Sequence, residues 1–155
     1  MSPQVGIVYG SPSDKDKMGH AAATLERFGV DYEMEAMSAH RSPERVRDYA
    51  ASAEDRGIKV LIAGAGRAAH LAGVVAAHTS LPVIGVPLSG GIMDGIDALL
   101  STVQMPAGVP VATVGVDGAA NAGVLAVQIL AAGDDELRKR LGEFKEQLAQ
   151  GLRLS

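Results

Sequence analysis

The sequence predicts an α/β fold in which a parallel sheet carries helices on both faces, and three features indicate it. Short apolar runs alternate with segments of helical periodicity, glycines stand at the ends of the apolar runs, and most of the runs are continuously hydrophobic. Continuous hydrophobicity is typical of strands buried on both sides. The 19 glycines among 155 residues are too many for a helical bundle. We therefore expect a three-layer α/β/α sandwich.

Five strand–helix units follow one another along the chain. Strands are expected at 5–10, 30–37, 59–64, 81–86 and 109–116. The first helix shows the spacing of an amphipathic helix that ends at a glycine, with apolar residues at Met18, Ala22, Leu25 and Phe28. The following helices are expected at 43–56, about 67–78, near 97–104 and at 119–132. Such a series predicts a five-stranded parallel sheet.

A last amphipathic helix is expected at about 134–153. Its apolar residues form one stripe: Leu137, Leu141, Phe144, Leu148 and Leu152. The stripe has two interpretations, since it can pack on the edge of the chain's own domain or cover a neighbouring subunit. We expect one domain over 1–155, with its core at 5–132, and we expect an oligomer.

Composition and charge exclude several classes of function. The net charge is −4 without a long basic run, which argues against a nucleic-acid or membrane-surface partner. Cysteine is absent, so disulfides and thiol chemistry are excluded. The sequence shows neither a signal-peptide pattern nor an apolar stretch of membrane-spanning length. We expect a cytoplasmic protein.

Polar and small residues gather at one edge of the predicted sheet. They follow the first four strands, at 10–14, 38–43, 64–70 and 87–95. The loops at the opposite edge contain far fewer residues that could bind a ligand or take part in catalysis. In open parallel sheets, ligands bind beyond the carboxyl ends of the strands. The sequence therefore places the functional site at this edge.

The turn GSPSD after the first strand has two interpretations. Ser13 and Asp16 stand at the spacing of a capping box, which satisfies a free amide at a helix start. A capping box does not explain Gly10 and Ser11. These residues lengthen the turn, so that amides and hydroxyls can face an anion at the positive end of the helix. Asp14 would repel a phosphate but could accept hydrogen bonds from sugar hydroxyls. A ribose phosphate satisfies both conditions.

The loop after the second strand supplies candidates for catalysis. Ser42 and Pro43 are explained as a helix start, the serine as its cap. His40 and Arg41 need another explanation: a guanidinium matches the geometry of a phosphate, and an imidazole is a natural proton carrier. His70 follows the third strand at the same edge and is a second catalytic candidate. The other two histidines lie in or at the end of helices and are interpreted as surface residues.

Cofactor and metal sites find little support. The segment 64–69 matches the dinucleotide fingerprint G-x-G-x-x-A, but the acidic residue expected about 20 positions later is absent. A phosphoacceptor receiver would have an aspartate where the third strand ends in Gly64. Aromatic residues to flank a flavin ring are few, and His40 and His70 lack clustered partners at metal-ligand spacing. We expect no cofactor and no metal.

Five segments carry a family resemblance: GSPSD, SAHRSP, AGAGRAAHL, LPVIGVP with its following loop, and LLSTVQMPAGVPVATV. In this order, from about Val5 to Ala132, they resemble N5-carboxyaminoimidazole ribonucleotide mutase, the second component of phosphoribosylaminoimidazole carboxylase in purine biosynthesis. The resemblance implies a flavodoxin-like sandwich. It also implies a homo-octamer with active sites near subunit contacts, acting without metal, ATP or biotin.

The resemblance also implies a substrate and a mechanism. The 5′-phosphate of an aminoimidazole ribonucleotide would lie on Ser11, Ser13 and Arg41, and its ribose on Asp14. Decarboxylation would release carbon dioxide into a closed pocket, carbon 4 of the imidazole would attack it, and His40 would shuttle the proton. A dry pocket would retain the carbon dioxide, and the loop 88–95 is a candidate lid. The positions that match those around the imidazole and the carboxylate are Ser38, Gly66, Ala68, His70 and Leu71.

Two classes of this family and one non-catalytic alternative stay open. Arg67 and Ala72 stand where the mutases usually have glycine and proline, and the class II carboxylases, which use carbon dioxide directly, carry an arginine in the matching loop. Those carboxylases usually have lysine after the histidine and no histidine at the place of His70, whereas this chain has Arg41 and His70. The sequence therefore favours the mutase. A non-catalytic nucleotide-binding module is disfavoured because His40 is present.

Overall fold

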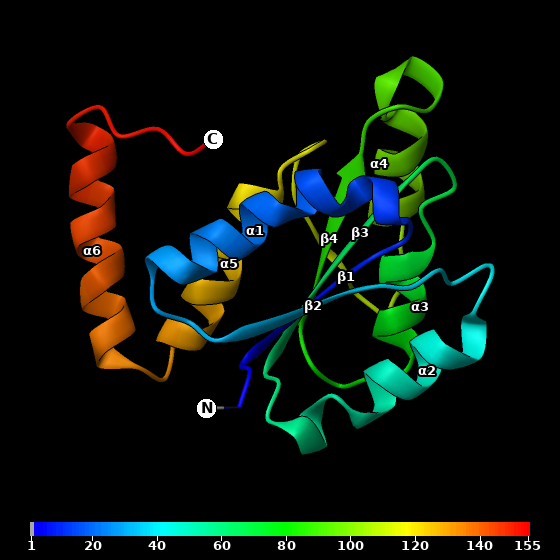
Figure 1. Cartoon of the computed structure of the whole chain (residues 1–155), viewed down its shortest axis with the longest axis horizontal. Helices are drawn as coiled ribbons and strands as arrows, with labels where there is room; N and C mark the ends of the chain where they lie inside the picture. The colour runs from blue at the N-terminus through cyan, green and yellow to red at the C-terminus, as the bar shows by residue number, and fades with distance from the viewer. Residues whose placement is uncertain (1) are drawn as a thin grey trace.

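A parallel sheet of five strands forms the middle layer of the computed structural model, which describes residues 2–155 (Figure 1). The strands are β1 (Val5–Tyr9), β2 (Tyr32–Ala36), β3 (Val60–Gly66), β4 (Val83–Leu88) and β5 (Ala112–Thr113). Their order is β2-β1-β3-β4-β5, and all neighbouring pairs are parallel. This is the strand order of the flavodoxin-like fold, so the expected fold class is confirmed.

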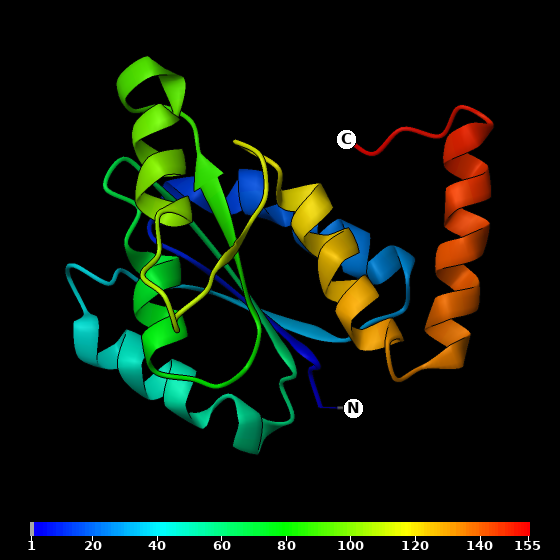
Figure 2. The ribbon, with the colours of Figure 1, turned by 180° about the vertical axis from the view of Figure 1, so that it is seen from behind.

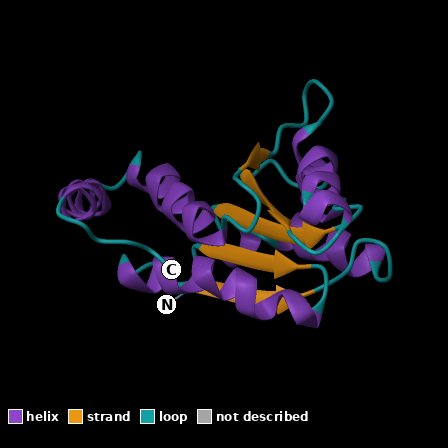
Figure 3. Cartoon of the chain, turned by 90° about the horizontal axis from the view of Figure 1, so that it is seen from above, coloured by secondary structure: helices purple, strands orange, loops and turns teal. Residues whose placement is uncertain are grey.

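Helices cover both faces of the sheet (Figure 3). They are α1 (Lys15–Arg27), α2 (Pro43–Ser52), α3 (Leu71–Ala77), α4 (Ile96–Val103), α5 (Ala119–Ala131) and α6 (Asp135–Ala149). Helices α1 and α5 pack on one face, and α2 and α3 on the other. Three short 3₁₀ helices lie in the connections: η1 (Pro12–Asp14), η2 (Glu54–Arg56) and η3 (Ile92–Asp94).

The sheet separates two apolar cores, because successive strand residues point to opposite faces. Ile7, Ile62 and Ile84 are fully buried in the core beneath α1 and α5. Val8 and Leu61 are fully buried in the core beneath α2 and α3. Continuous hydrophobicity of the strands therefore corresponds to burial on both sides, as the sequence predicted.

Several predicted boundaries were wrong. The helices expected at 43–56 and at about 134–153 end earlier, at Ser52 and Ala149. Two further differences have a clear local reason. Strand β5 has two residues instead of the predicted 109–116. It lies at the edge of the sheet, and Pro110 just before it has no N–H to donate to a ladder. Helix α3 begins at Leu71 instead of about residue 67, because β3 extends to Gly66 and Arg67 then adopts a left-handed backbone with φ of 56°.

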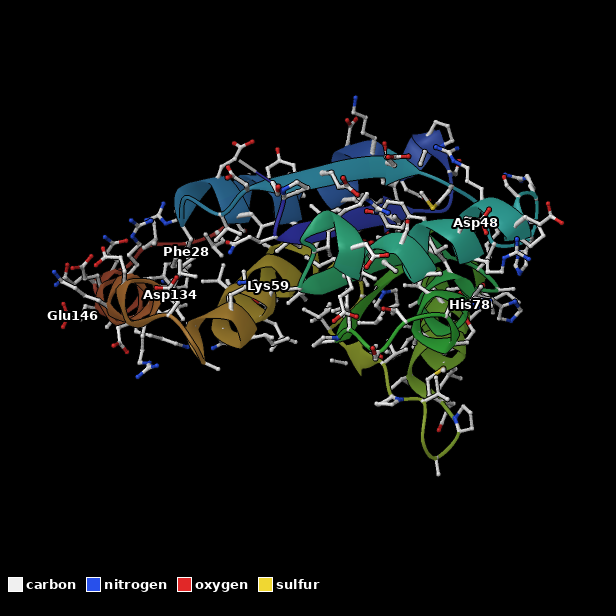
Figure 4. The ribbon with its side chains drawn as sticks, turned by 90° about the horizontal axis from the view of Figure 1, so that it is seen from below. Phe28, Asp48, Lys59, His78, Asp134 and Glu146 are labelled. Carbon is white, nitrogen blue, oxygen red and sulfur yellow. The ribbon has the colours of Figure 1, made fainter. Side chains whose placement is uncertain are left out.

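The C-terminal helix α6 packs across the ends of α1 and α5, at one end of the molecule (Figure 2). Figure 4 labels Phe28 at this contact, where its ring meets that of Phe144 edge to face with centroids 5.2 Å apart. Leu137 and Phe144 are buried, and the rest of the apolar stripe is partly buried against the same core. The stripe thus packs against its own chain, with Leu137 and Phe144 covered and the remaining leucines partly exposed. Among the described residues, no helix is long and apolar enough to cross a membrane.

Candidate active site

A cavity of about 690 Å³ opens at the carboxyl edge of the sheet, between the loops that follow β1, β2, β3 and β4. Every site residue predicted from the sequence lines this cavity: Gly10, Ser11, Ser13, Asp14, Ser38, His40, Arg41, Gly66, Ala68, His70 and Leu71. The lining also contains residues that were not predicted as site residues: Lys17, Ala39, Ala65, Arg67, Ser89 and Gly90. His20 and His78 lie on exposed positions away from this lining, and Figure 4 labels His78 at the end of α3.

The turn after β1 is held together by its own residues. Ser11 is the N-cap of η1, and its Oγ accepts a hydrogen bond from the N–H of Ser13 at 3.4 Å. The two serine hydroxyls are 2.9 Å apart, and the N–H of Asp14 donates to the carbonyl of Ser11 at 2.9 Å. The predicted capping box of Ser13 and Asp16 was wrong, because the 3₁₀ turn shifts the start of α1 to Lys15. Ser11 forms the side-chain cap instead.

Asp14 brings a carboxyl group into the cavity wall beside these hydroxyls. Partial burial raises the pKa of this carboxyl above its ordinary value, against the opposing effects of the Lys17 cation and a backbone hydrogen bond at Ser11. Burial disfavours the charged form of an acid, and a nearby cation favours it. Ionisation of Asp14 in the cavity therefore costs free energy. Hydrogen-bond donors of a ligand would offset this cost.

Ser38 shapes the loop after β2. Its Oγ accepts the N–H of Arg41 at 3.1 Å, and its carbonyl accepts the N–H of Ser42 at 2.8 Å. Pro43 is the first residue of α2 as predicted, but the Ser42 side chain forms no cap hydrogen bond within the described chain. Arg41 is exposed at the cavity, and no ion pair found over residues 2–155 includes it. Its guanidinium can therefore meet a phosphate in bidentate geometry.

His40 and His70 contact each other across the cavity. Nε2 of His40 lies 2.7 Å from Nδ1 of His70, and the rings meet edge to face at 83°. In this hydrogen bond one nitrogen must donate and the other accept, so the tautomer of one ring determines that of the other. The histidines follow β2 and β3, which flank β1 in the sheet. The pair therefore spans the end of β1, beside the turn that starts at Gly10.

The glycine-rich loop after β3 is fixed from α4. The N–H of Ala69 donates to Oγ of Ser101 at 2.9 Å, and this hydroxyl donates to the carbonyl of Asp97 at 2.7 Å. A side chain at Gly66 would come within 3.4 Å of the carbonyl of Leu88, which makes this a close approach between the ends of β3 and β4. The loop thereby presents Arg67 and Ala68 to the cavity.

Lys17 lines the cavity but was not predicted as a site residue, although the sequence contains a signal for it. It stands three positions after Asp14, and residues three apart lie on the same side of a helix. A helix that starts at the binding turn therefore carries Lys17 along the cavity. Ser89 and Gly90 were expected only as part of the candidate lid at 88–95.

Comparisons with known proteins show the family of the chain. Residues 4–151 match the family model described as AIR carboxylase. The chain is 56% identical to N5-carboxyaminoimidazole ribonucleotide mutase of Pyrococcus abyssi over 146 residues, which cover 94% of this chain and 84% of that protein. The mutase of Bacillus subtilis is 54% identical over 152 residues, 97% of this chain and 94% of the other.

A solved structure shows the same fold. The crystal structure of Treponema denticola PurE matches with a TM-score of 0.86 and 32% identity, covering 96% of this chain and 92% of that one. A family model that spans nearly the whole chain, relatives with more than half of their residues identical, and a matching fold all agree with the resemblance carried by GSPSD and SAHRSP. The chain therefore belongs to the AIR carboxylase family.

Proposed function

We propose that the cavity described above performs the carboxyl transfer of purine biosynthesis that converts N5-carboxyaminoimidazole ribonucleotide to 4-carboxyaminoimidazole ribonucleotide. One observation carries the proposal: the turn after β1, Arg41 and the histidine pair meet in a single cavity of a chain that is 54 to 56% identical to named mutases. The chain is an enzyme, and the mutase class is favoured over the direct carboxylase.

The residues that line the cavity determine how the substrate is oriented. The 5′-phosphate binds Ser11, Ser13 and Arg41, because two hydroxyls at a helix N-terminus and a guanidinium all stabilise an anion. The ribose hydroxyls donate to Asp14. Gly10 and Ser38 keep the backbone of the two loops close to the ligand, and the base then extends toward Gly66, Ala68 and Leu71.

The histidine pair moves the proton. Loss of the carboxyl group from the exocyclic nitrogen releases carbon dioxide, and the nitrogen takes up one proton. Carbon 4 then attacks the carbon dioxide and loses its own proton, so the two steps together conserve protons. His40 serves as the acid and base, and His70 exchanges the proton with it through the 2.7 Å contact. Closure of the cavity keeps the carbon dioxide beside carbon 4.

Arg67 is the observation that favours a second candidate function. It lines the cavity with a left-handed backbone where the mutases usually have glycine. An added guanidinium near the base end would suit a direct carboxylase, which must capture carbon dioxide from solution. This class II carboxylase is the alternative that the experiment has to separate.

The test gives the purified protein two substrates in parallel and follows the carbon-4 carboxylated product. One reaction contains N5-carboxyaminoimidazole ribonucleotide without bicarbonate, and the other contains aminoimidazole ribonucleotide with bicarbonate near its physiological concentration. Rapid turnover of the first alone is expected. Efficient use of the second alone would assign the chain to the direct carboxylases, and turnover of neither would overturn the proposed function.

We further propose that the protein acts in the cytoplasm as a homo-octamer, in line with its ribonucleotide substrate and its family resemblance. Apolar side chains are exposed on η3 and α4, which project at the upper right of Figure 1: Ile92, Met93, Ile96, Leu100 and Val103. Exposed large apolar residues that gather on neighbouring elements are typical of a subunit contact. The solution mass measured by light scattering tests this proposal, and a monomer would contradict it.

A further inference from the structure

Ser89, the first residue after β4, is held by two charged side chains from distant parts of the chain. Asp117 accepts the N–H of Ser89 at 2.9 Å through Oδ1 and the hydroxyl of Ser89 through Oδ2. Lys17 donates to the hydroxyl oxygen of Ser89 at 2.9 Å and to its carbonyl at 3.2 Å. Lys17 and Asp117 form an ion pair of 3.8 Å. Every polar group of Ser89 is therefore engaged by this pair.

The backbone of Asp117 is also held in position against β4. Its N–H donates to the carbonyl of Pro87 at 2.8 Å, so its backbone and its side chain both bind the end of β4. Its φ is 57°, in the left-handed region that residues other than glycine rarely adopt. Such a conformation persists where surrounding contacts determine it, and often at functional sites. Here those contacts lead to Pro87 and Ser89.

The pair anchors the cavity end of a loop, from Ser89 to Gly95, whose other hydrogen bonds are made mostly within the loop. Gly90, Met93, Asp94 and Gly95 all have positive φ, and Met93 is 78% exposed. Inside the loop, the N–H of Gly90 donates to the carboxylate of Asp94 at 3.0 Å. The contact with a helix comes at the far end, where the N–H of Ile92 donates to the carboxylate of Asp97 in α4 at 3.0 Å. Because Ser89 and Gly90 line the cavity, the position of this wall depends on Lys17 and Asp117.

The charges of the pair also suit an anionic ligand. Burial alone would raise the pKa of Asp117, but the hydrogen bonds from Ser89 and the Lys17 cation outweigh it and lower this pKa. Asp117 thus stays ionised, and it also disfavours the charged form of Asp14. Lys17 lies close to both carboxylates and offsets the repulsion that they would exert on a ribonucleotide phosphate or carboxylate.

We propose that Lys17 and Asp117 are positioning residues for the carboxyl transfer: their joint hold on Ser89 fixes the wall of the cavity on the β4 side, next to the Gly66 loop. The consequence for catalysis rests on the proposed function, whereas the hold on Ser89 does not. With the wall in place, the cavity stays closed around carbon dioxide while carbon 4 attacks. With the wall released, carbon dioxide escapes and aminoimidazole ribonucleotide leaves unreacted.

The variants to compare are Lys17→Met, Asp117→Asn and their double variant. Methionine keeps the length of the side chain without the charge, and asparagine tolerates the left-handed backbone while it loses the charge and the second carboxylate acceptor. The matched controls are Lys15→Met, two residues away in α1, and Asp31→Asn, in the exposed turn before β2. Thermal unfolding checks that all variants are folded.

The first measurement is hydrogen exchange of the backbone amides from Ser89 to Gly95 in the ligand-free protein, which needs no activity. We expect about ten-fold faster exchange of this segment in Lys17→Met and Asp117→Asn, and unchanged exchange in both controls. Exchange like that of the controls would overturn the proposed hold on Ser89, whatever the enzyme does.

The second measurement is turnover of N5-carboxyaminoimidazole ribonucleotide together with the aminoimidazole ribonucleotide that is released. We expect kcat to fall about ten-fold in each single variant, with a larger released fraction, because a displaced wall impairs the reaction. KM should change little in Asp117→Asn and rise in Lys17→Met, which also loses the cation that offsets the carboxylates. The double variant should be no worse than either single variant, since the two residues act as one unit. Unchanged kcat, or additive losses in the double variant, would overturn the positioning role. A wild-type protein without turnover would overturn the proposed function alone.

Discussion

The turn after β1 and the histidine pair meet in one cavity, but different interactions hold them in place. In the turn, Ser11 bonds with Ser13 and Asp14, residues two and three positions away. His40 and His70 are 30 positions apart and come from loops on either side of β1. The turn is therefore a local structure, whereas the pair exists only when the whole sheet is assembled. On the proposed function, the local turn and Arg41 bind the phosphate and the histidine pair moves the proton, so mutations should separate binding from turnover.

The largest expected effect comes from His40→Asn. This variant removes the proposed proton carrier and keeps a side chain of similar size, so kcat should fall by about 10²–10⁴-fold. Ribonucleotide binding, measured by calorimetry, should stay within a few-fold because the turn after β1 is untouched. His20→Asn, on the exposed side of α1, is the matched control. An active His40→Asn enzyme would contradict the assigned role.

Arg41→Ala should produce the reverse pattern. Loss of a charge-assisted hydrogen bond to phosphate should weaken ribonucleotide binding by about 10- to 100-fold. The change in kcat at saturation should be small, since the histidine pair stays in place. Arg45→Ala serves as the control, because Arg45 pairs with Glu35 on the surface and lies outside the cavity lining. Equal affinity of both variants for the ribonucleotide would show that Arg41 does not bind the phosphate.

Ser101→Ala tests how far the histidine side depends on remote support. The variant removes the acceptor for the N–H of Ala69, next to His70, and leaves every cavity side chain in place. The free energy of unfolding should decrease by about 1 kcal/mol. A looser His70 should lower kcat several-fold with little change in ribonucleotide affinity. Ser52→Ala, whose hydroxyl also bonds within its own helix, is the control; equal kcat in the two variants would argue against coupling between α4 and the histidine pair.

The fold was largely predictable, because burial on both sides of a strand leaves a continuous apolar run in the sequence. The edge strand β5 was overestimated, since an apolar run at an edge pairs on one side only and Pro110 shortens it. Both α4 and α6 carry large apolar side chains. Only the structure shows that Phe144 is covered by the chain itself while Leu100 is exposed.

The cavity was predictable for a related reason: parallel strands bring their following loops to one edge, so polar loop residues could be grouped without distances. Three features needed the structure. The contact of His40 with His70 depends on the strand order, and the cap at Ser11 depends on the 3₁₀ turn that moves the helix start. Asp117 follows the fifth strand, far in sequence from Lys17 and Ser89, and no local pattern relates the three.

The smallest effect expected is one of stability, and it distinguishes the two sides of the cavity again. The pKa of Asp14 is raised in the folded protein by burial, so its ionised form destabilises the fold. Below the ordinary pKa of about 3.8, Asp14 is protonated in both the folded and the unfolded chain and does not destabilise the fold. As the pH rises through the raised pKa of the folded state, the group ionises there and the folded state loses stability. Asp14→Asn should therefore unfold at slightly higher urea concentration than the wild type at pH 7, and the difference should vanish toward pH 3.

The same variant should bind the ribonucleotide more weakly, because a carboxylate that is unfavourable without a ligand is favourable once ribose hydroxyls donate to it. A variant less stable than the wild type at pH 7 would mean that Asp14 supports the turn itself, and the binding side of the cavity would then be part of the structural framework.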